Sequence, residues 1–351
     1  MNLSWKINED YLLAKTNNFK FNKHIAMFDL DNTLIATKSN KRFPLNENDW
    51  KFKYDNIKKI LNILVDNNYS IIIITNQGGI ENGKQNRQEW QTKVNNIIKS
   101  LNIDIMLFCS TGINRFRKPQ PTFYTEYIKV IEPNPYMIFY CGDALGRLDD
   151  HSDSDLKFAL NCKIDIISPE TLFLNKSIII PDVKYPDLIF KLFDFTFEPA
   201  RKRKEIIIMY GYPASGKSCI SYYITKNYNY VVINQDTLKT KSKCKKVCIE
   251  YMQKNKNIII DATNKDIAIR KEWIDIALKH DYYITSIIVD TSKDVSKHNN
   301  HYRHYNFNIK LVPNVVYNLN YEEPTTSEKI DRIITTTNFT PIDLNYFMFF
   351  Y

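Results

Sequence analysis

Short apolar runs, several of them almost entirely isoleucine, alternate along this chain with longer stretches in which apolar residues recur at helical spacing. Runs of four to eight apolar residues are typical of strands buried on both faces, and intervening helices indicate parallel pairing. The expected strands are 25–28, 71–74, 105–108, 137–140, 205–210, 230–233, 257–261 and 284–289. The expected helices are 55–67, 87–101, 122–131, 217–226, 243–254 and 266–279. The pattern predicts an α/β fold in which helices cover both faces of parallel sheets.

The alternation occurs twice, and a stretch at about 181–204 interrupts it. That stretch contains three prolines and the basic run Arg201–Lys204. A chain of 351 residues is long enough for two domains at roughly 150 residues each. We therefore predict two three-layer α/β/α domains, at 1–199 and 200–351, joined by a linker at about 181–204. The basic run is expected to be a solvated linker, with a nuclear localisation signal as the alternative.

The apolar runs are of strand length, and none approaches the roughly 20 residues that a membrane-spanning helix needs. Residues 1–10 include Glu9 and Asp10 and lack the apolar core of a signal peptide. The six cysteines are scattered, without a Cys-x-x-Cys pair, which favours reduced thiols. We expect an intracellular protein, cytoplasmic or nuclear and not secreted, that acts as a monomer without a membrane partner.

The chain is basic, with 48 Lys and Arg against 39 Asp and Glu, for a net charge of +9. A basic balance attracts polyanions, nucleic acid first, through contacts to phosphate groups. Compositional drift is the alternative, because the chain is also rich in Lys, Asn and Ile. His298, His301 and His304 recur every three residues, but the Cys or Glu-x-x-His context of a zinc site is missing.

Polar residues follow three of the strands expected in the first half, those at 25–28, 71–74 and 137–140. A lysine opens a helical segment between the last two of these strands. Asp29 and Asp31 come directly after the strand that ends at residue 28. The other groups, in chain order, are Thr75 with Asn76, then Lys118, then Asp143. Ligands of such sheets bind beyond the carboxyl ends of the strands. Paired carboxylates can supply a nucleophile or metal ligand and an acid–base group, and oxygen ligands favour Mg²⁺ over zinc. The order predicts a phosphate and Mg²⁺ site.

These four motifs resemble those of the haloacid dehalogenase superfamily of aspartyl-phosphate phosphatases. The resemblance implies that Asp29 is the nucleophile and that Asp31 protonates the leaving hydroxyl and later activates water. It further implies that Thr75, Asn76 and Lys118 bind phosphate. Asp29, Asp31 and Asp143 are the residues it places around Mg²⁺.

A second phosphate site is predicted in the other half by the motif Gly-x4-Gly-Lys-Ser at 211–218. It stands between an expected strand and an expected helix, which is the context that a P-loop requires. Backbone amides at the start of the helix cradle phosphates, the lysine reaches the β and γ groups, and the serine binds Mg²⁺. The residues expected to bind ATP are Gly211, Ala214, Ser215, Gly216, Lys217 and Ser218.

Three further residues are candidates for the acceptor side of this second site. Asp236 follows the strand at 230–233 and is suited to take a proton from an attacking hydroxyl; the alternative is a helix N-cap. Asp261 ends the next strand and could orient a metal, and Asn264 could be a helix cap. Arg303 is a candidate lid arginine over the transferred phosphoryl group, although a lone arginine on a helix is more often solvated.

A phosphatase followed by a P-loop kinase is similar to the bifunctional polynucleotide kinase 3′-phosphatase family of DNA end repair. The similarity extends from about Trp5 to the C-terminus and includes Lys-Arg-Phe-Pro at 41–44 and His-Asn-Asn at 298–300. The other matching segments are 29–35, 75–80, 117–119, 140–147, 150–155, 158–161, 211–218, 234–238 and 261–264.

The family resemblance implies Mg²⁺ and ATP as cofactors and nucleic-acid ends as substrates, with DNA ends that carry a 3′-phosphate or a 5′-hydroxyl expected first. It casts Asp236 as the base that deprotonates the 5′-hydroxyl, and Arg303 as a lid arginine. Gln235 and His301 stand where the family commonly has arginines, which bears on kinase efficiency. A forkhead-associated domain is not expected, since 28 residues precede Asp29.

Three alternatives stay open from the sequence. An RNA-repair enzyme would use the same chemistry, and no residue distinguishes deoxyribose from ribose. A nucleic-acid-binding protein with one inactive domain is disfavoured by the presence of Asp29, Asp31, Lys118 and Lys217. A small-metabolite phosphatase fused to a nucleoside kinase is disfavoured by the net charge of +9.

Overall fold

The computed structural model describes residues 3–183, 188, 194–337 and 344–350. The chain divides into two compact units, one made of Met1–Lys184 with Met348–Tyr351 and the other of Tyr185–Phe347. The expected division after residue 199 therefore falls within the second unit. Of the expected linker at about 181–204, residues 184–187 and 189–193 lie outside the described part of the chain.

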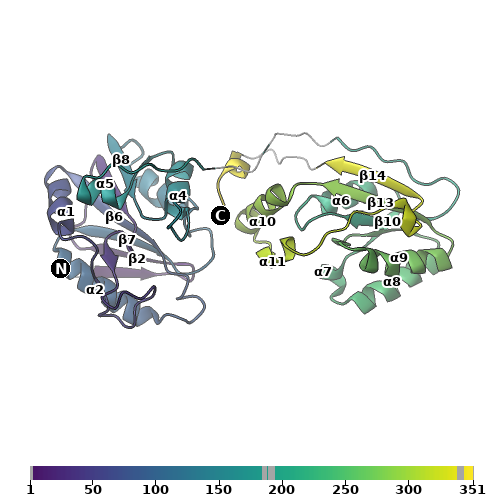
Figure 1. Ribbon diagram of the computed structural model, residues 1–351, viewed down its shortest axis with the longest axis horizontal. Coiled ribbons are helices and arrows are strands. Elements are labelled where there is room, and N and C mark those ends of the chain that lie inside the picture. Colours follow the sequence, from purple (N-terminus) through teal and green to yellow (C-terminus); the bar gives the residue numbers. More distant parts are fainter. Residues whose placement is uncertain (1–2, 184–187, 189–193, 338–343, 351) are drawn as a thin grey trace. The chain divides into compact units, whose positions relative to one another are not determined.

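The first unit is built on a seven-stranded sheet in the order β1-β2-β7-β6-β3-β8-β9 (Figure 1). The strands are β1 Leu3–Ile7, β2 Tyr11–Thr16, β3 His24–Phe28, β6 Tyr69–Asn76, β7 Ile105–Ser110, β8 Met137–Cys141 and β9 Asp165–Ile167. From β7 to β9 the pairing is parallel. The expectation of a parallel sheet is wrong at one edge, where β1 and β2 run antiparallel. The three residues between them leave room only for a hairpin, which Asn8 N closes by donating to Tyr11 O at 2.9 Å.

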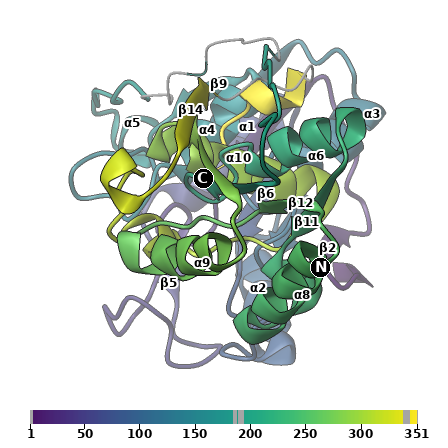
Figure 2. The ribbon, with the colours of Figure 1, turned by 90° about the vertical axis from the view of Figure 1, so that its right-hand side faces the viewer.

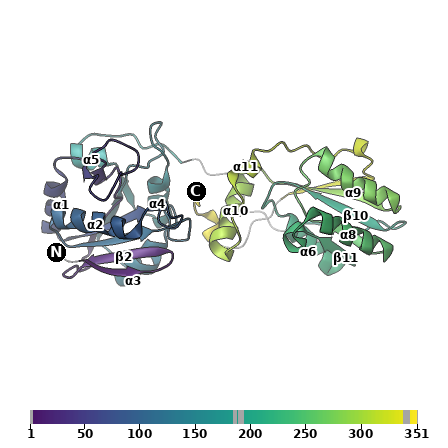
Figure 3. The same ribbon diagram turned by 90° about the horizontal axis from the view of Figure 1, so that it is seen from below.

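Helices cover both faces of this sheet because alternate strand residues point to opposite sides. Ile71 and Ile73 of β6 pack with α1, α2 and α5, whereas Ile72 and Ile74 pack with the segment at 116–128 and with α4. In Figure 3, α2 and α3 lie on opposite sides of β2. The helices are α1 Ile57–Asp66, α2 Arg87–Leu101, α3 Lys129–Ile131, α4 Ser154–Cys162 and α5 Pro169–Leu174, and a small separate hairpin joins β4 Ile35–Ala36 to β5 Lys51–Phe52.

One expected helix has a different form. The segment at 122–131 contains a π-helical turn, Tyr124–Ile128, followed by the short α3. The hydroxyl of Thr125 donates to Pro121 O at 3.2 Å, the same carbonyl that its own backbone N–H binds at 2.9 Å. A side chain that shares a backbone acceptor in this way loosens regular helical geometry.

The second unit contains a five-stranded parallel sheet in the order β11-β12-β10-β13-β14. Its strands are β10 Glu205–Tyr210, β11 Tyr230–Ile233, β12 Asn257–Ile260, β13 Tyr283–Asp290 and β14 Arg332–Thr337. Its helices are α6 Lys217–Asn227, α7 Gln235–Leu238, α8 Lys241–Gln253, α9 Ile267–Lys279, α10 Lys293–Phe307 and α11 Asn314–Tyr317, with a 3₁₀ turn at Thr326–Glu328 and another at Leu344–Phe347.

The two faces of the second sheet are also covered separately. Ile206 and Ile208 pack with residues of α8 and α9, whereas Ile207 and Met209 pack with α6 and with Phe197. Figure 2 shows α6 on one side of β11 and β12 and α8 on the other. The predicted α/β class with two three-layer architectures is therefore confirmed. Strand β14 was not predicted, because its six residues include few apolar side chains and most of them are half-buried.

Both sheets bring polar groups to the carboxyl ends of neighbouring strands. Asp29 follows β3, Asn76 ends β6, and Asp143 lies two residues beyond β8. In the second unit the P-loop follows β10, and Asp261 follows β12. All six cysteines are free thiols. No helix in the described part of the chain is long and apolar enough to cross a bilayer.

Candidate active sites

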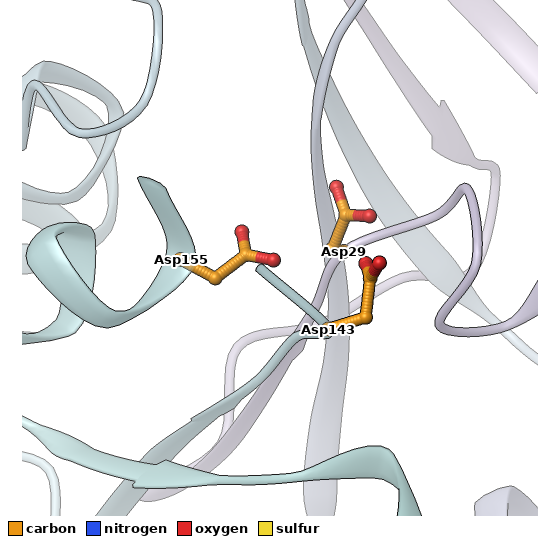
Figure 4. A group of neighbouring side chains, drawn as sticks. All are labelled: Asp29, Asp143 and Asp155. Atoms are coloured by element: carbon orange, nitrogen blue, oxygen red, sulfur yellow. The ribbon is translucent and has the colours of Figure 1, made fainter. Parts of the chain in front are cut away.

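Three carboxylates gather at the end of the first sheet (Figure 4). Asp29, Asp143 and Asp155 each offer an oxygen, and these oxygens all lie within 4.8 Å of one another. Asp29 and Asp143 come from the loops after β3 and β8, while Asp155 comes from the first turn of α4. Asp29 and Asp155 are buried. Asp155 lies in the segment 150–155 that matches the family, but no role was predicted for it from the sequence.

Lys118 is the cation of this cluster. Its ammonium group donates to Asp29 Oδ1 at 2.5 Å, to Asp155 Oδ1 at 2.7 Å and to the hydroxyl of Tyr140 at 2.6 Å. Asp155 also accepts from Tyr140 at 3.0 Å and from the backbone N–H of Ala144 at 3.0 Å. All three protons of the ammonium thus have acceptors, and Asp155 directs Lys118 toward Asp29.

The electrostatics of this cluster favour a bound cation. Burial raises the pKa of Asp29 well above its ordinary value, and the charges of Asp155 and Asp143 raise it further despite the opposing charge of Lys118. Burial and the charge of Asp155 likewise raise the pKa of Asp143 to about 6. Three carboxylates, two of them buried, face one ammonium group, so a divalent cation would offset the excess negative charge. An all-oxygen donor set of this kind fits Mg²⁺.

Asp31 lies outside that carboxylate cluster. Its Oδ1 accepts from Lys93 Nζ at 3.2 Å, and its Oδ2 accepts from Gln77 Nε2 at 2.6 Å. The side chain of Lys93 is 4% exposed, and that of Asp31 is 43% exposed. The structure therefore places the carboxylate of Asp155, rather than that of the expected Asp31, close enough to Asp29 and Asp143 for all three to bind one metal ion. Asp31 instead lies between a buried ammonium group and solvent.

Lys93 was missed by the sequence analysis, although a signal for it exists. It lies on α2 three residues after Trp90 and four before Ile97, both buried. A lysine at a buried position of an amphipathic helix needs a partner for its charge. The spacing could have identified Lys93 as a functional candidate, but it could not have identified Asp31 as the partner.

Thr75 and Asn76, expected to bind phosphate, end β6 beside the cluster. Thr75 is buried, and its Oγ1 accepts from Gln77 Nε2 at 2.9 Å. The side chain of Asn76 binds the backbone of Lys118 twice, through Nδ2 to the carbonyl at 3.0 Å and through Oδ1 from the N–H at 2.9 Å. Both polar atoms of the Asn76 amide are engaged, so in this structure Asn76 positions the segment that carries Lys118.

In the second unit, the P-loop has the open backbone that a phosphate cradle needs. Gly211, Ala214 and Gly216 have φ angles of +145°, +59° and +106°. A Cβ added at Gly211 would lie 2.8 Å from Ser215 Oγ and 2.9 Å from the carbonyl oxygen of Val289, so only glycine fits there. Ser215 is buried, whereas Ser218 is exposed at the start of α6.

Lys217 is the first residue of α6, directly after this loop, and is buried. Its ammonium group donates to the carbonyl of Gly211 at 2.9 Å, to that of Tyr212 at 2.5 Å and to Ser215 Oγ at 3.3 Å. Burial lowers the pKa of Lys217 to about 8, while Asp261 acts to raise it and Arg303 to lower it further. A buried ammonium group surrounded by neutral acceptors is stabilised by an incoming anion, as a phosphate-binding role requires.

Asp236 is exposed on α7, and among the described residues no donor contacts its carboxylate. The alternative that Asp236 caps this helix is wrong, because the cap is Asn234, whose side chain accepts from Asp236 N at 2.7 Å. Asn264 is not a cap either. It is buried and donates to the carbonyl of Met209 at 2.7 Å, and the cap of α9 is Asp266.

Asp261 and Arg303 are the two charged groups that act on the pKa of Lys217. Asp261 is buried and accepts from Asn234 Nδ2 at 3.4 Å. Within the described chain, the buried Nε of Arg303 has no hydrogen-bond partner. Burial lowers the pKa of His301 to about 4, so His301 is neutral at pH 7 and does not replace the cation of an arginine.

Known proteins share both halves of this arrangement. Residues 24–173 match the family described as polynucleotide kinase 3 phosphatase, and residues 206–316 match the family described as AAA domain. A bifunctional polynucleotide phosphatase/kinase of Schizosaccharomyces pombe is 34% identical over 336 residues, which cover 93% of this chain and 82% of the relative. The chain belongs to the bifunctional polynucleotide phosphatase/kinase family.

Two other relatives are named for one or both of these activities. A protein of Acanthamoeba polyphaga mimivirus, named for the same two activities, is 29% identical over 401 residues, covering 95% of this chain and 90% of the relative. A polynucleotide 3′-phosphatase of Saccharomyces cerevisiae is 28% identical over 208 residues, covering 43% of this chain and 87% of the relative. The predicted family and enzyme class, a hydrolase joined to a transferase, are confirmed.

Proposed function

We propose that this member of the family removes 3′-phosphates from polynucleotide ends and phosphorylates 5′-hydroxyl ends with ATP, giving DNA termini that can be ligated. The phosphatase would lie within residues 1–199 and the kinase within 200–351, and the protein would act as an intracellular monomer. The observation that supports this most directly is the presence of two phosphate-handling clusters, each at the carboxyl end of its own sheet.

In the phosphatase reaction, a carboxylate oxygen of Asp29 attacks the phosphorus of the 3′-phosphate. The bond between phosphorus and the 3′ oxygen breaks, and Asp31, which is partly exposed, gives that oxygen a proton. Asp31 then takes a proton from a water molecule that attacks the aspartyl phosphate, which releases inorganic phosphate and restores Asp29. Lys118 and Thr75 hold the phosphoryl oxygens, and Asn76 fixes the backbone of Lys118.

Mg²⁺, when bound, would reduce the repulsion between the attacking carboxylate and the phosphate. Asp29 and Asp143 would hold it, joined by Asp155 in this structure or by Asp31 as expected from the motif. The raised pKa values of Asp29 and Asp143 support this assignment, because a site built to hold a cation is electrostatically unfavourable for carboxylates alone.

In the kinase reaction, the P-loop amides hold the phosphates of ATP and Lys217 reaches the β and γ groups. Ser218 would hold Mg²⁺, which would offset the charge of these phosphates. Asp236 takes the proton of the 5′-hydroxyl while that oxygen attacks the γ-phosphorus and the bond to ADP breaks. The exposure of Asp236 is what access by a polymeric substrate requires. The guanidinium of Arg303 offsets the charge of the transferred group.

A nucleic-acid acceptor is also supported by the charge around Asp236. Lys239, Lys243 and Lys246 follow it closely in sequence and are exposed. Within the described chain, the acidic partner of this region is Glu272, which pairs with Lys241 at 2.8 Å and Lys245 at 2.7 Å. Exposed lysines beside an acceptor group suit the phosphates of a strand better than an isolated small metabolite.

End-group analysis of a nicked DNA duplex with a 3′-phosphate and a 5′-hydroxyl tests the proposal. We expect loss of the 3′-phosphate with Mg²⁺ alone and gain of a 5′-phosphate only when ATP is added. Both rates should fall steeply as the salt concentration rises. Faster turnover of an RNA nick would assign the enzyme to RNA repair. Activity confined to mononucleotides and indifferent to salt would contradict a polynucleotide substrate.

A further inference from the structure

The motif His298-Asn299-Asn300 has no role in the reactions described above, although all three side chains are buried on α10. Asn300 binds the backbone of Val312 through both ends of its amide, at 2.9 and 3.1 Å, which fixes the chain after the helix. Asn299 binds the P-loop at Ala214, and both His298 and Asn299 bind Tyr346. Asn299 therefore connects the P-loop to Tyr346, which is near the C-terminus in sequence.

Three consecutive carbonyl groups of the P-loop are each bound by a side chain from outside the loop. Tyr317 Oη donates to Pro213 O at 3.3 Å, Asn299 Nδ2 to Ala214 O at 3.0 Å, and Thr291 Oγ1 to Ser215 O at 2.9 Å. The amides of a P-loop turn toward the phosphate, so the carbonyls at 213–215, which face away from Lys217, need donors of their own. Asn299 binds the middle carbonyl, at the residue with a φ of +59°.

The direction of the Asn299 amide is set by Tyr346. Tyr346 Oη donates to Asn299 Oδ1 at 2.6 Å. An amide oxygen held by a hydroxyl leaves the amide nitrogen facing Ala214, as the loop requires. Tyr346 is 1% exposed, its carbonyl accepts from His298 Nε2 at 2.5 Å, and its ring meets the rings of His298 and Tyr302 edge to face. Tyr346 is therefore fixed through its ring, its backbone and its hydroxyl.

We propose that Tyr346 is a positioning residue for the kinase: through Asn299 it holds the P-loop in the conformation that binds the phosphates of ATP. This inference rests on the proposed kinase function of the second unit. Without the hydroxyl, the Asn299 amide can turn its oxygen toward the carbonyl of Ala214, which cannot donate a hydrogen bond, and the loop loses one of its three outer bonds. Binding of ATP then weakens, while the acceptor side of the site is unchanged.

The test is Tyr346→Phe, which keeps the ring and removes one oxygen. One neutral hydrogen bond is worth about 0.5–1.5 kcal/mol, so we expect the KM for ATP and the Kd for ATP to rise roughly two- to tenfold. The kcat at saturating ATP and the KM for a 5′-hydroxyl oligonucleotide should stay as they are. The Asn299→Ala variant should weaken ATP binding at least as much, and adding Tyr346→Phe to it should cost nothing more.

Tyr282→Phe is the matched control. Tyr282 is 3% exposed in the same unit, and its hydroxyl donates to Lys256 O at 2.8 Å, away from the P-loop. It should lower the melting temperature about as much as Tyr346→Phe without changing ATP binding. Unchanged ATP binding in Tyr346→Phe, or effects of Tyr346→Phe and Asn299→Ala that simply add, would overturn the inference. A wild-type protein that binds ATP but does not label 5′ ends would refute the kinase function alone, because the binding measurements still test Tyr346.

Discussion

Replacing Arg270 by methionine should destabilise the second unit more than any other single change of an arginine described here. Arg270 is fully buried on α9, and its guanidinium makes two bonds to Glu328, at 2.9 and 2.7 Å. It also donates to the carbonyls of Asn264 at 3.0 Å and Glu322 at 2.6 Å. Methionine fills a similar volume but donates to none of these groups.

The magnitude follows from what the substitution leaves behind. The side chain of Glu328 is 6% exposed, so Arg270→Met leaves a buried carboxylate without its cation. Breaking a buried ion pair from one side costs about 3–5 kcal/mol. The free energy of unfolding of a domain is about 5–15 kcal/mol. Asn264, whose carbonyl also loses a donor, binds Met209 beside the P-loop, so kinase activity should fall with stability.

Urea titration with pulse proteolysis, following the fragment that contains residues 185–347, measures the stability of this unit. Arg203→Met is the matched control, because Arg203 is 40% exposed and pairs with Asp281 and Asp331; we expect it to cost less than about 1 kcal/mol. Adding Glu328→Gln to Arg270→Met removes the orphaned charge and should restore part of the loss. A cost below about 1 kcal/mol for Arg270→Met, or a double variant as unstable as the sum of the two single variants, would refute the reasoning.

Three further predictions concern the sites and the histidines. Asp236→Asn should slow 5′ phosphorylation by roughly 10²- to 10⁴-fold with unchanged ATP affinity and melting temperature, since Asn234 caps the helix; near-normal turnover would remove Asp236 from the catalytic residues. Lys93→Met should slow removal of a 3′-phosphate from an oligonucleotide by up to about fivefold, and hydrolysis of p-nitrophenyl phosphate less, because nitrophenolate leaves without a proton from Asp31; equal losses would contradict this. Burial lowers the pKa of His298 and His301 to about 4 from 6.5, so the stability that depends on their neutral forms is complete above pH 6.5 and is lost as the pH falls toward 4. The urea midpoint of the second unit should report a loss of about 2 kcal/mol per histidine between pH 7 and 5, and a flat profile would show that neither is protonated on unfolding.

The strands that place both sites could be predicted because burial on two faces leaves a local signature. Ile71–Ile74 is such a run, and β10 was predicted with its observed ends, Glu205 and Tyr210. The P-loop is equally local, since the φ angles at Gly211 and Gly216 require glycine at fixed spacing. The edge strands β1 and β14 have no fully buried residue, and their pattern is correspondingly weaker.

The partners within each site could not be predicted in the same way, because they are set by tertiary structure. Asp155 is 12 residues from Asp143 and approaches it through the first turn of α4. Lys93 of α2 reaches Asp31, which lies in the loop after β3. Nothing in the sequence around Asn76 indicates that its amide is used on the backbone of Lys118. Residue type and strand ends predicted which chemistry is present, and the packing of distant helices determined which groups meet.

Asp29→Ala tests whether one chain carries two independent phosphate chemistries. On a DNA nick with a 3′-phosphate and a 5′-hydroxyl, this variant should leave the 3′-phosphate in place and still label the 5′ end from ATP at close to the wild-type rate. Lys217→Ala, the matched variant of the other site, should do the reverse. Loss of both activities in an Asp29→Ala protein that remains folded, or retention of 3′-phosphate removal, would contradict the account.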